Sequence, residues 1–302
     1  MIFFGSATPV SKMLTDAMPV SIASGARVGL GGLALLPFVW GRLGQARLPS
    51  GADLWPLAGI SVFGMFGFTV FLLTGMKLVS GVAGAIVMSA TPAVTAIAAV
   101  LFLGEEPTGR KVLALVLAVA GLVILQVGGD PSSGAGAPAF PANDPLTDFL
   151  RGLEGRRPLL GIALVFAAVC CKAAYTLLGR SLSQRTDPAL VACLGTTASL
   201  PLFGVLIWVQ WPSFAPSAVS VGDWAAFLWF GAGTLAAGTV LWYRGTVRTE
   251  GSVAAGFMAL MPVSALVLSY VLLGERFAWI HLAGFAVVFL GVLLIAKEHA
   301  ES

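Results

Sequence analysis

The chain has 302 residues, of which 58% are hydrophobic and only 10% are charged, and its formal net charge at pH 7 is +3. A soluble globular domain carries about 25% charged residues. This chain therefore has too few polar side chains to cover a water-exposed surface, and its composition predicts a polytopic membrane protein. Its basic residues form no aromatic-interleaved stripe, so we expect no binding of nucleic acid.

Hydropathy and Gly/Pro punctuation predict an all-α membrane protein with ten transmembrane helices, since one span needs roughly 20 apolar residues. The expected spans are 1–18, 21–41, 54–76, 80–103, 108–127, 158–180, 188–210, 222–245, 250–273 and 278–297. The first is the weakest because it contains Lys12 and Asp16. It leads us to expect that a longer natural amino terminus precedes it or that the start codon is misplaced. No basic region precedes its apolar stretch, so a cleaved signal peptide is not predicted.

Residues 80–125 and 250–295 are two versions of one apolar segment. A constant offset of 170 in residue number superimposes Gly81 on Gly251, Met88 on Met258, Pro92 on Pro262, and Gly104-Glu105 on Gly274-Glu275. The register extends backwards to Thr69 and Thr239. This duplication predicts a first repeat over 1–127, a Gly- and Pro-rich extracytoplasmic linker over 128–157, a second repeat over 158–297 and a cytoplasmic tail over 298–302.

The distribution of basic residues predicts the orientation. With ten spans, nine Lys and Arg residues in short loops fall on the side of the two termini, against two on the other side: Arg42, Arg47, Arg110, Lys111, Arg180, Arg185, Arg244, Arg248 and Lys297 against Lys77 and Arg276. Both termini are therefore expected in the cytoplasm. Because each repeat has an odd number of spans, the second repeat is inverted relative to the first, as in carriers that expose a midplane site alternately to each side.

Several short motifs recur in the same order in one family of carriers. They are Gly5-Ser6, Ala26-Arg27, Pro92 with Leu103-Gly104-Glu105, Ala174-Tyr175-Thr176, Gly179-Arg180, Leu241-Trp242-Tyr243-Arg244-Gly245, and Pro262 with Gly274-Glu275. In these motifs the chain resembles the drug/metabolite transporter superfamily, in particular its EamA-type ten-helix members. The resemblance implies export or exchange of small metabolites, often amino acids or drug-like compounds, across a bacterial inner membrane. The long loop at 128–157 and Lys172 depart from the family pattern.

Ionisable side chains at membrane depth are costly and therefore informative. Lys172 lies some fourteen residues into its span, about 21 Å at 1.5 Å per residue. It either points into a cavity and pairs with an anionic group of a substrate, or it is held by backbone carbonyls or reaches the cytoplasmic interface. Lys12, which matches Arg180 at an offset of 168, and Arg27, which lies near the outer end of its span, are interpreted as structural charges.

Asp and Glu all fall in loops or at helix ends. A proton-coupled exporter of lipophilic cations needs a buried carboxylate, so we expect a neutral, zwitterionic or anionic cargo instead. Glu105 and Glu275 are expected to close helix ends by pairing with Arg110 or other loop cations.

Pro92 and Pro262 fall within spans, at equivalent places in the two repeats. A proline displaces the carbonyl four residues earlier, here that of Met88 or Met258, which predicts hinges or cavity lining at these four residues. Two aromatic residues are the further candidates for contact with the cargo, Tyr175 and Trp242.

Three alternatives to a metabolite carrier differ in what they require. A nucleotide-sugar or phosphorylated-metabolite exchanger of the same superfamily would also use the deep cations. An embedded enzyme needs a nucleophile with a base, a carboxylate pair or a metal set, and a structural or sensory protein needs no repeat. The three cysteines lie in apolar runs and the two histidines have no companions at metal spacing, so neither metal nor cofactor is predicted. The expected partners are a small-molecule substrate and the lipid bilayer.

Overall fold

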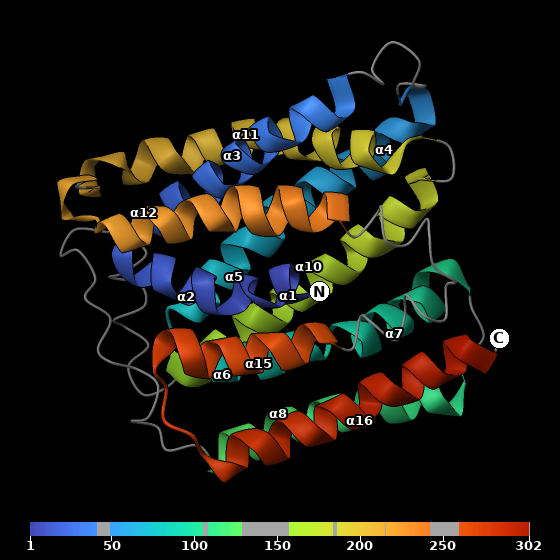
Figure 1. Ribbon diagram of the computed structural model, residues 1–302. Helices are drawn as coiled ribbons and strands as arrows, with labels where there is room; N and C mark the ends of the chain where they lie inside the picture. The colour runs from blue at the N-terminus through green and yellow to red at the C-terminus, as the bar shows by residue number, and fades with distance from the viewer. Residues whose placement is uncertain are drawn as a thin grey trace.

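The computed structural model describes residues 1–40, 49–104, 108–128, 157–183, 186–214, 216–241 and 260–301. Within these residues every regular element is a helix (Figure 1). In the first half they are α1 Ile2–Gly5, α2 Ala7–Ala17, α3 Val20–Trp40, η1 Gly51–Asp53, α4 Leu54–Gly59, η2 Ile60–Gly67, α5 Phe68–Met76, α6 Gly81–Ser89, α7 Thr91–Leu103 and α8 Gly109–Gly128. In the second they are α10 Arg157–Ser183, α11 Pro188–Gln210, η3 Trp211–Ser213, η4 Pro216–Ala218, α12 Val221–Leu228, η5 Trp229–Ala237, α15 Leu260–Leu273 and α16 Trp279–Glu301.

Six helical stretches of the described chain are long and apolar enough to cross a membrane: Val20–Trp40, Gly51–Met76, Gly81–Phe102, Pro158–Ser183, Ala189–Gln210 and Val221–Leu241. Two shorter apolar helices follow, Leu260–Leu273 and Trp279–Leu294. The prediction of an all-α, multi-pass membrane protein is confirmed. The helices begin and end within a few residues of the expected spans wherever the chain is described.

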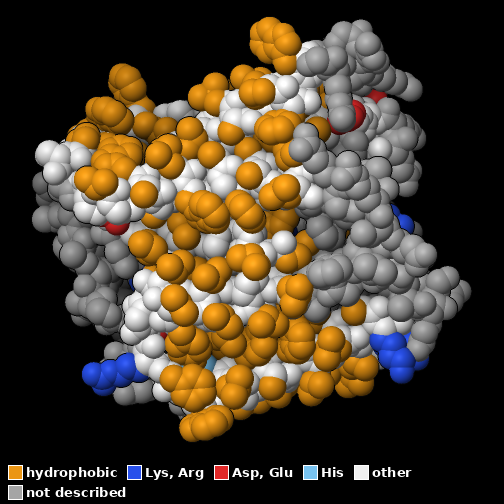
Figure 2. All heavy atoms as spheres, in the orientation of Figure 1, with side chains coloured by type: hydrophobic (Ala, Val, Ile, Leu, Met, Phe, Trp, Pro, Cys, Tyr) orange, Lys and Arg blue, Asp and Glu red, His pale blue; other side chains and the backbone are white. Residues whose placement is uncertain are grey.

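The outer surface is apolar, as a lipid-facing surface must be. Figure 2 shows hydrophobic side chains spread over the described part of the visible face, with Lys and Arg only near its edges. Tryptophans at helix ends are among the most exposed side chains, including Trp55 at 83%, Trp208 at 85% and Trp279 at 76% exposure. Tryptophan prefers the interface between lipid and water, so these positions indicate where the helices leave the hydrocarbon.

Two helices that the sequence suggested to be regular each contain a π-helical segment, η2 and η5. The repeat offset brings the two segments to nearly equivalent positions in the two halves. Glycines allow neighbouring side chains to approach these wide turns: a Cβ at Gly64 would collide with the ring of Tyr175, and a Cβ at Gly231 would meet Leu30 at 2.9 Å. Such π-segments are frequent at functional sites.

Corresponding helices of the two halves pack against one another. α8 contacts α16, and α3 contacts α11. In Figure 1, α8 and α16 lie side by side and run in opposite directions, as do α3 and α11. α7 and α15 end at Gly104 and Gly274, which the repeat offset superimposes. Their φ values are +67° and +61°, left-handed values that favour glycine at a helix end.

Gly121 of α8 and Gly291 of α16 occupy equivalent places in the contact between these two helices. A Cβ at Gly121 would collide with Val288 Cγ2 and would lie 2.7 Å from the Gly284 carbonyl oxygen. A Cβ at Gly291 would lie 2.9 Å from the Ala114 carbonyl oxygen. The close approach of backbones that small residues permit stabilises such helix pairs in lipid.

Gly121→Ala is therefore expected to lower the free energy of unfolding by about 1–3 kcal/mol, because the backbone of α16 must move to admit the methyl group. Gly179→Ala, on α10, is the matched control, since nothing lies within 4 Å of a Cβ there. Thermal denaturation of the purified protein in detergent compares the two variants. Equal stability of both would show that α8 and α16 do not pack as described.

Candidate functional site: a cavity between the two halves

A cavity of about 130 Å³ lies between the first and second halves. Its walls come from α1, α2, α3, η2, α5 and α6 of the first half and from α10, α11, η5 and α15 of the second. This volume is well above the roughly 10–15 Å³ that a single water molecule needs on the same measure. The cavity can therefore hold a small solute in the conformation described.

The walls of the cavity follow the repeat. Four pairs of lining residues are related by the repeat offset of 170: Gly5 and Tyr175, Gly64 and Thr234, Met65 and Leu235, and Thr69 and Thr239. Equivalent residues thus face one space from opposite sides, although the chemistry is not the same on both. The offset of 168 that relates Lys12 to Arg180 also relates Phe4 to Lys172. The cavity therefore has an aromatic residue in the first half at the position equivalent to a cation in the second.

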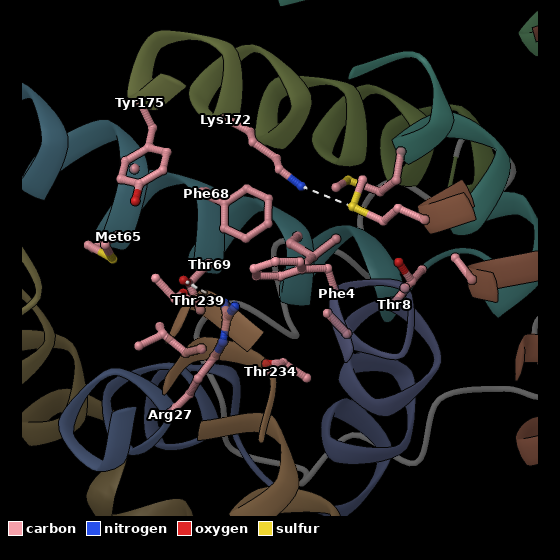
Figure 3. Close-up of a pocket in the computed structure, with 18 of the residues that line it drawn as sticks. Phe4, Thr8, Arg27, Met65, Phe68, Thr69, Lys172, Tyr175, Thr234 and Thr239 are labelled. Atoms are coloured by element: carbon pink, nitrogen blue, oxygen red, sulfur yellow. Dashed lines mark hydrogen bonds between the residues drawn. The ribbon is translucent and has the colours of Figure 1, made fainter. Parts of the chain in front are cut away.

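Arg27 of α3 points into this space (Figure 3). Its Nη1 donates a hydrogen bond to Thr69 Oγ1 at 3.1 Å, and its Cζ lies 4.2 Å from the ring centre of Phe230. Arg27 is only 7% exposed, and its Nε has no hydrogen-bond partner. The sequence suggested a structural charge near the outer end of the span, whereas α3 turns this side chain inward to the cavity.

Lys172 of α10 also lines the cavity. Its Nζ lies 3.9 Å from Met261 Sδ, a weak acceptor, and 5.9 Å from the ring centre of Phe68. The guanidinium carbon of Arg27 lies 5.7 Å from the same ring. In Figure 3 the rings of Phe68 and Phe4 lie between the two cations.

No Asp or Glu is among the described residues that line the cavity. Two cations therefore face one small space that offers no carboxylate from these walls. In a medium of low dielectric constant, a charge without a counter-ion is costly, and an anion that entered would be attracted strongly. The described residues also contain no group of three His, Cys, Asp or Glu side chains that could hold a metal ion.

Of the other candidate residues, Tyr175, Met88 and Pro262 line the cavity, whereas Pro92 does not. Pro92 stands in the first turn of α7, after a break between α6 and α7. The Met88 carbonyl accepts a hydrogen bond from Thr91 Oγ1 at 2.6 Å. The carbonyl thus has a hydroxyl partner, and the role of Pro92 and Pro262 as hinges stays a prediction.

Glu275 links the two halves through backbone amides of α6. Its carboxylate accepts hydrogen bonds from the amides of Gly81 and, at 2.9 Å, of Val82, at the start of α6. Burial raises the pKa of the Glu275 carboxyl, and the two amides and nearby Lys12 oppose this rise. Glu275 thus caps α6, and Lys12 lies close enough to support it.

Three candidate residues, Trp242, Met258 and Glu105, lie outside the described residues. The sequence prediction did not select most of the polar and aromatic wall, notably Phe4, Thr8, Phe68 and Thr196. Of the lining residues that were not selected, Thr69 and Thr239 had a sequence signal, because the repeat offset superimposes them.

Residues 1–127 and 159–297 match the EamA-like transporter family. The chain belongs to this family. It is a membrane transporter of the EamA-like family, within the drug/metabolite transporter superfamily, as the motifs in its sequence suggested.

Two relatives illustrate what this family member is similar to. The uncharacterized transporter YetK of Bacillus subtilis (strain 168) is 27% identical over 100% of this chain and 86% of its own length. A protein of Streptantibioticus cattleyicolor named "Probable terminal-alkyne amino-acid exporter" is 25% identical over 99% of this chain and 91% of its own. One protein of known crystal structure is 17% identical in sequence, and its alignment covers 96% of this chain and 94% of the other chain. The TM-score is 0.59, which indicates a shared fold.

Proposed function

We propose that this EamA-like transporter carries small organic solutes across a bacterial cytoplasmic membrane by alternating access, as an exporter or exchanger. The observation that carries the proposal is the cavity between the halves, with lining residues paired at the repeat offset. A site shared by two equivalent halves can open to one side when they rock one way and to the other side when they rock back.

In this proposal the helical segments form ten spans in two inverted five-helix repeats, with both termini in the cytoplasm. The antiparallel packing of α8 on α16 and of α3 on α11 supports the inversion, since a two-fold axis in the membrane plane requires such pairs. The nine-to-two bias of basic residues supports the orientation. The π-segments η2 and η5, which line the cavity from opposite halves, are the hinges of the movement.

The cargo is neutral, zwitterionic or anionic in this proposal, because no carboxylate among the described lining residues would pair with a cationic solute. The name of the Streptantibioticus relative adds amino acids to the solutes worth testing. The second candidate is an exchanger of phosphorylated metabolites or nucleotide sugars, which the two cavity cations favour. A cavity of about 130 Å³ favours the smaller members of that class.

Counterflow in proteoliposomes tests the proposal. Vesicles containing the purified protein are loaded with one solute from a panel of amino acids and organic acids, and entry of the labelled solute is followed. We expect transient accumulation of at least one solute, and a lower accumulation of that solute with Lys172→Ala. Absence of flux for every member of the panel, with protein shown to be folded and inserted, would contradict the transport function.

A further inference from the structure

The two cavity cations differ in position in a way that constrains the shape of the cargo. Arg27 comes from α3 in the first half and Lys172 from α10 in the second. Their distances to the ring centre of Phe68 are 5.7 Å and 5.9 Å, and Figure 3 places the ring between them. The cavity therefore has two positive ends and an apolar middle.

Neither cation is neutralised by the described walls. The polar neighbours of Arg27 are hydroxyl groups, such as the Thr69 Oγ1 that accepts its hydrogen bond, and its buried Nε has no partner. The hydrogen bond described for the Lys172 ammonium goes to a thioether sulfur. Among the described residues, therefore, neither cation is paired with an anionic group, and an anion that enters the cavity could accept further charge-assisted hydrogen bonds from both.

We propose that the cargo is a small dicarboxylate, with one carboxylate on the guanidinium of Arg27, the other on the ammonium of Lys172, and a short apolar chain against Phe68 and Phe4. This inference rests on the proposed transport function and names its substrate class. A zwitterionic amino acid fits less well, because its ammonium group would meet two cations and no acid from the described walls. A monocarboxylate leaves one cation unpaired.

Each end has its own role in recognition. The guanidinium presents a planar fork that suits a bidentate carboxylate, whereas the ammonium is a point charge on a flexible stem. Arg27 therefore fixes the first carboxylate, and Lys172 selects for a second one at the right distance. Phe68, the first residue of α5 after the π-segment η2, sets the spacing.

The test compares straight-chain dicarboxylates of four to six carbons with monocarboxylates of equal length, neutral amino acids and a phosphate monoester. Counterflow measures transport, and thermal stabilisation of the protein in detergent measures binding independently. We expect the best dicarboxylate to exceed the matching monocarboxylate about 10- to 100-fold in kcat/KM, the size of one charge-assisted contact.

Lys172→Met should abolish this preference while monocarboxylate flux remains. Lys172→Arg, which retains the positive charge, should keep the dicarboxylate preference. Comparing its stability with that of Lys172→Met distinguishes loss of the charge from a folding defect.

Arg180→Gln, an exposed cation eight residues further along α10, is the matched control and should change nothing. Equal or better flux of amino acids, monocarboxylates or the phosphate ester would overturn the dicarboxylate assignment while transport stands. If Lys172→Met still prefers dicarboxylates to monocarboxylates, the dicarboxylate assignment is overturned as well. Binding of dicarboxylates without flux would support the site and contradict the transport function, and absence of both would contradict both.

Discussion

Replacing Arg27 by methionine is expected to reduce cargo flux about 10- to 100-fold while leaving the protein at least as thermostable as the wild type. The loss follows from removal of a charge-assisted contact to the cargo, worth about 1.5–3 kcal/mol, or tenfold for each 1.4 kcal/mol. The stability follows from burial, because Arg27 is 7% exposed and its Nε is unpartnered, so that methionine removes a costly buried charge.

This combination separates a binding residue from a structural one. If Arg27 only held α3 in place through Thr69 and Phe230, methionine would lower the thermal stability and leave the flux per folded molecule unchanged. Arg27→Lys serves as the companion variant, since it keeps the charge but loses the fork, and it should transport at an intermediate rate. Thermal denaturation in detergent and counterflow on the same preparations measure both quantities.

Replacing Glu275 by alanine is expected to lower the free energy of unfolding by about 1–3 kcal/mol and to slow counterflow as well. Glu275 accepts hydrogen bonds from the Gly81 and Val82 amides, and removing it leaves two partly buried donors of α6 without their partner. Because the loop after α15 supplies this cap to a helix of the other half, its loss also shifts the balance between the conformations that open to either side.

Asp223 provides the matched control because it is a capping residue within one half. It forms a reciprocal capping box with Ser220 at the start of α12. Asp223→Ala should therefore cost about 1 kcal/mol of stability and leave counterflow per folded molecule unchanged. If the Asp223 and Glu275 variants slow transport equally, the contact between the halves has no special part in the cycle.

Much of the architecture could be predicted from the sequence because apolar length and glycine and proline positions are local signals. The helix bounds followed from hydropathy, and the repeat offset that pairs Gly104 with Gly274 reappears as two left-handed helix ends. The match of Thr69 with Thr239 likewise reappears as two residues that face one cavity.

The parts that could not be predicted depend on rotation about helix axes and on backbone partners. Hydropathy gives the depth of Arg27 along α3 but not the direction in which the side chain points, and it places Lys172 deep without naming Phe68 as its neighbour. The hydrogen-bond partners of Glu275 were missed because backbone amides carry no sequence signature. The π-segments were missed because a short π-helical stretch hardly changes an apolar pattern.

The central claim, a cavity between two halves that opens alternately to each side, is tested most directly by labelling one cysteine from both sides. Thr239→Cys, at a lining position, is introduced after Cys170, Cys171 and Cys193 are replaced by alanine. A membrane-impermeant thiol reagent is applied to right-side-out and to inside-out vesicles. We predict labelling from both sides, and slower labelling in the presence of a transported solute. Labelling from one side only, with no protection by any solute, would contradict the account.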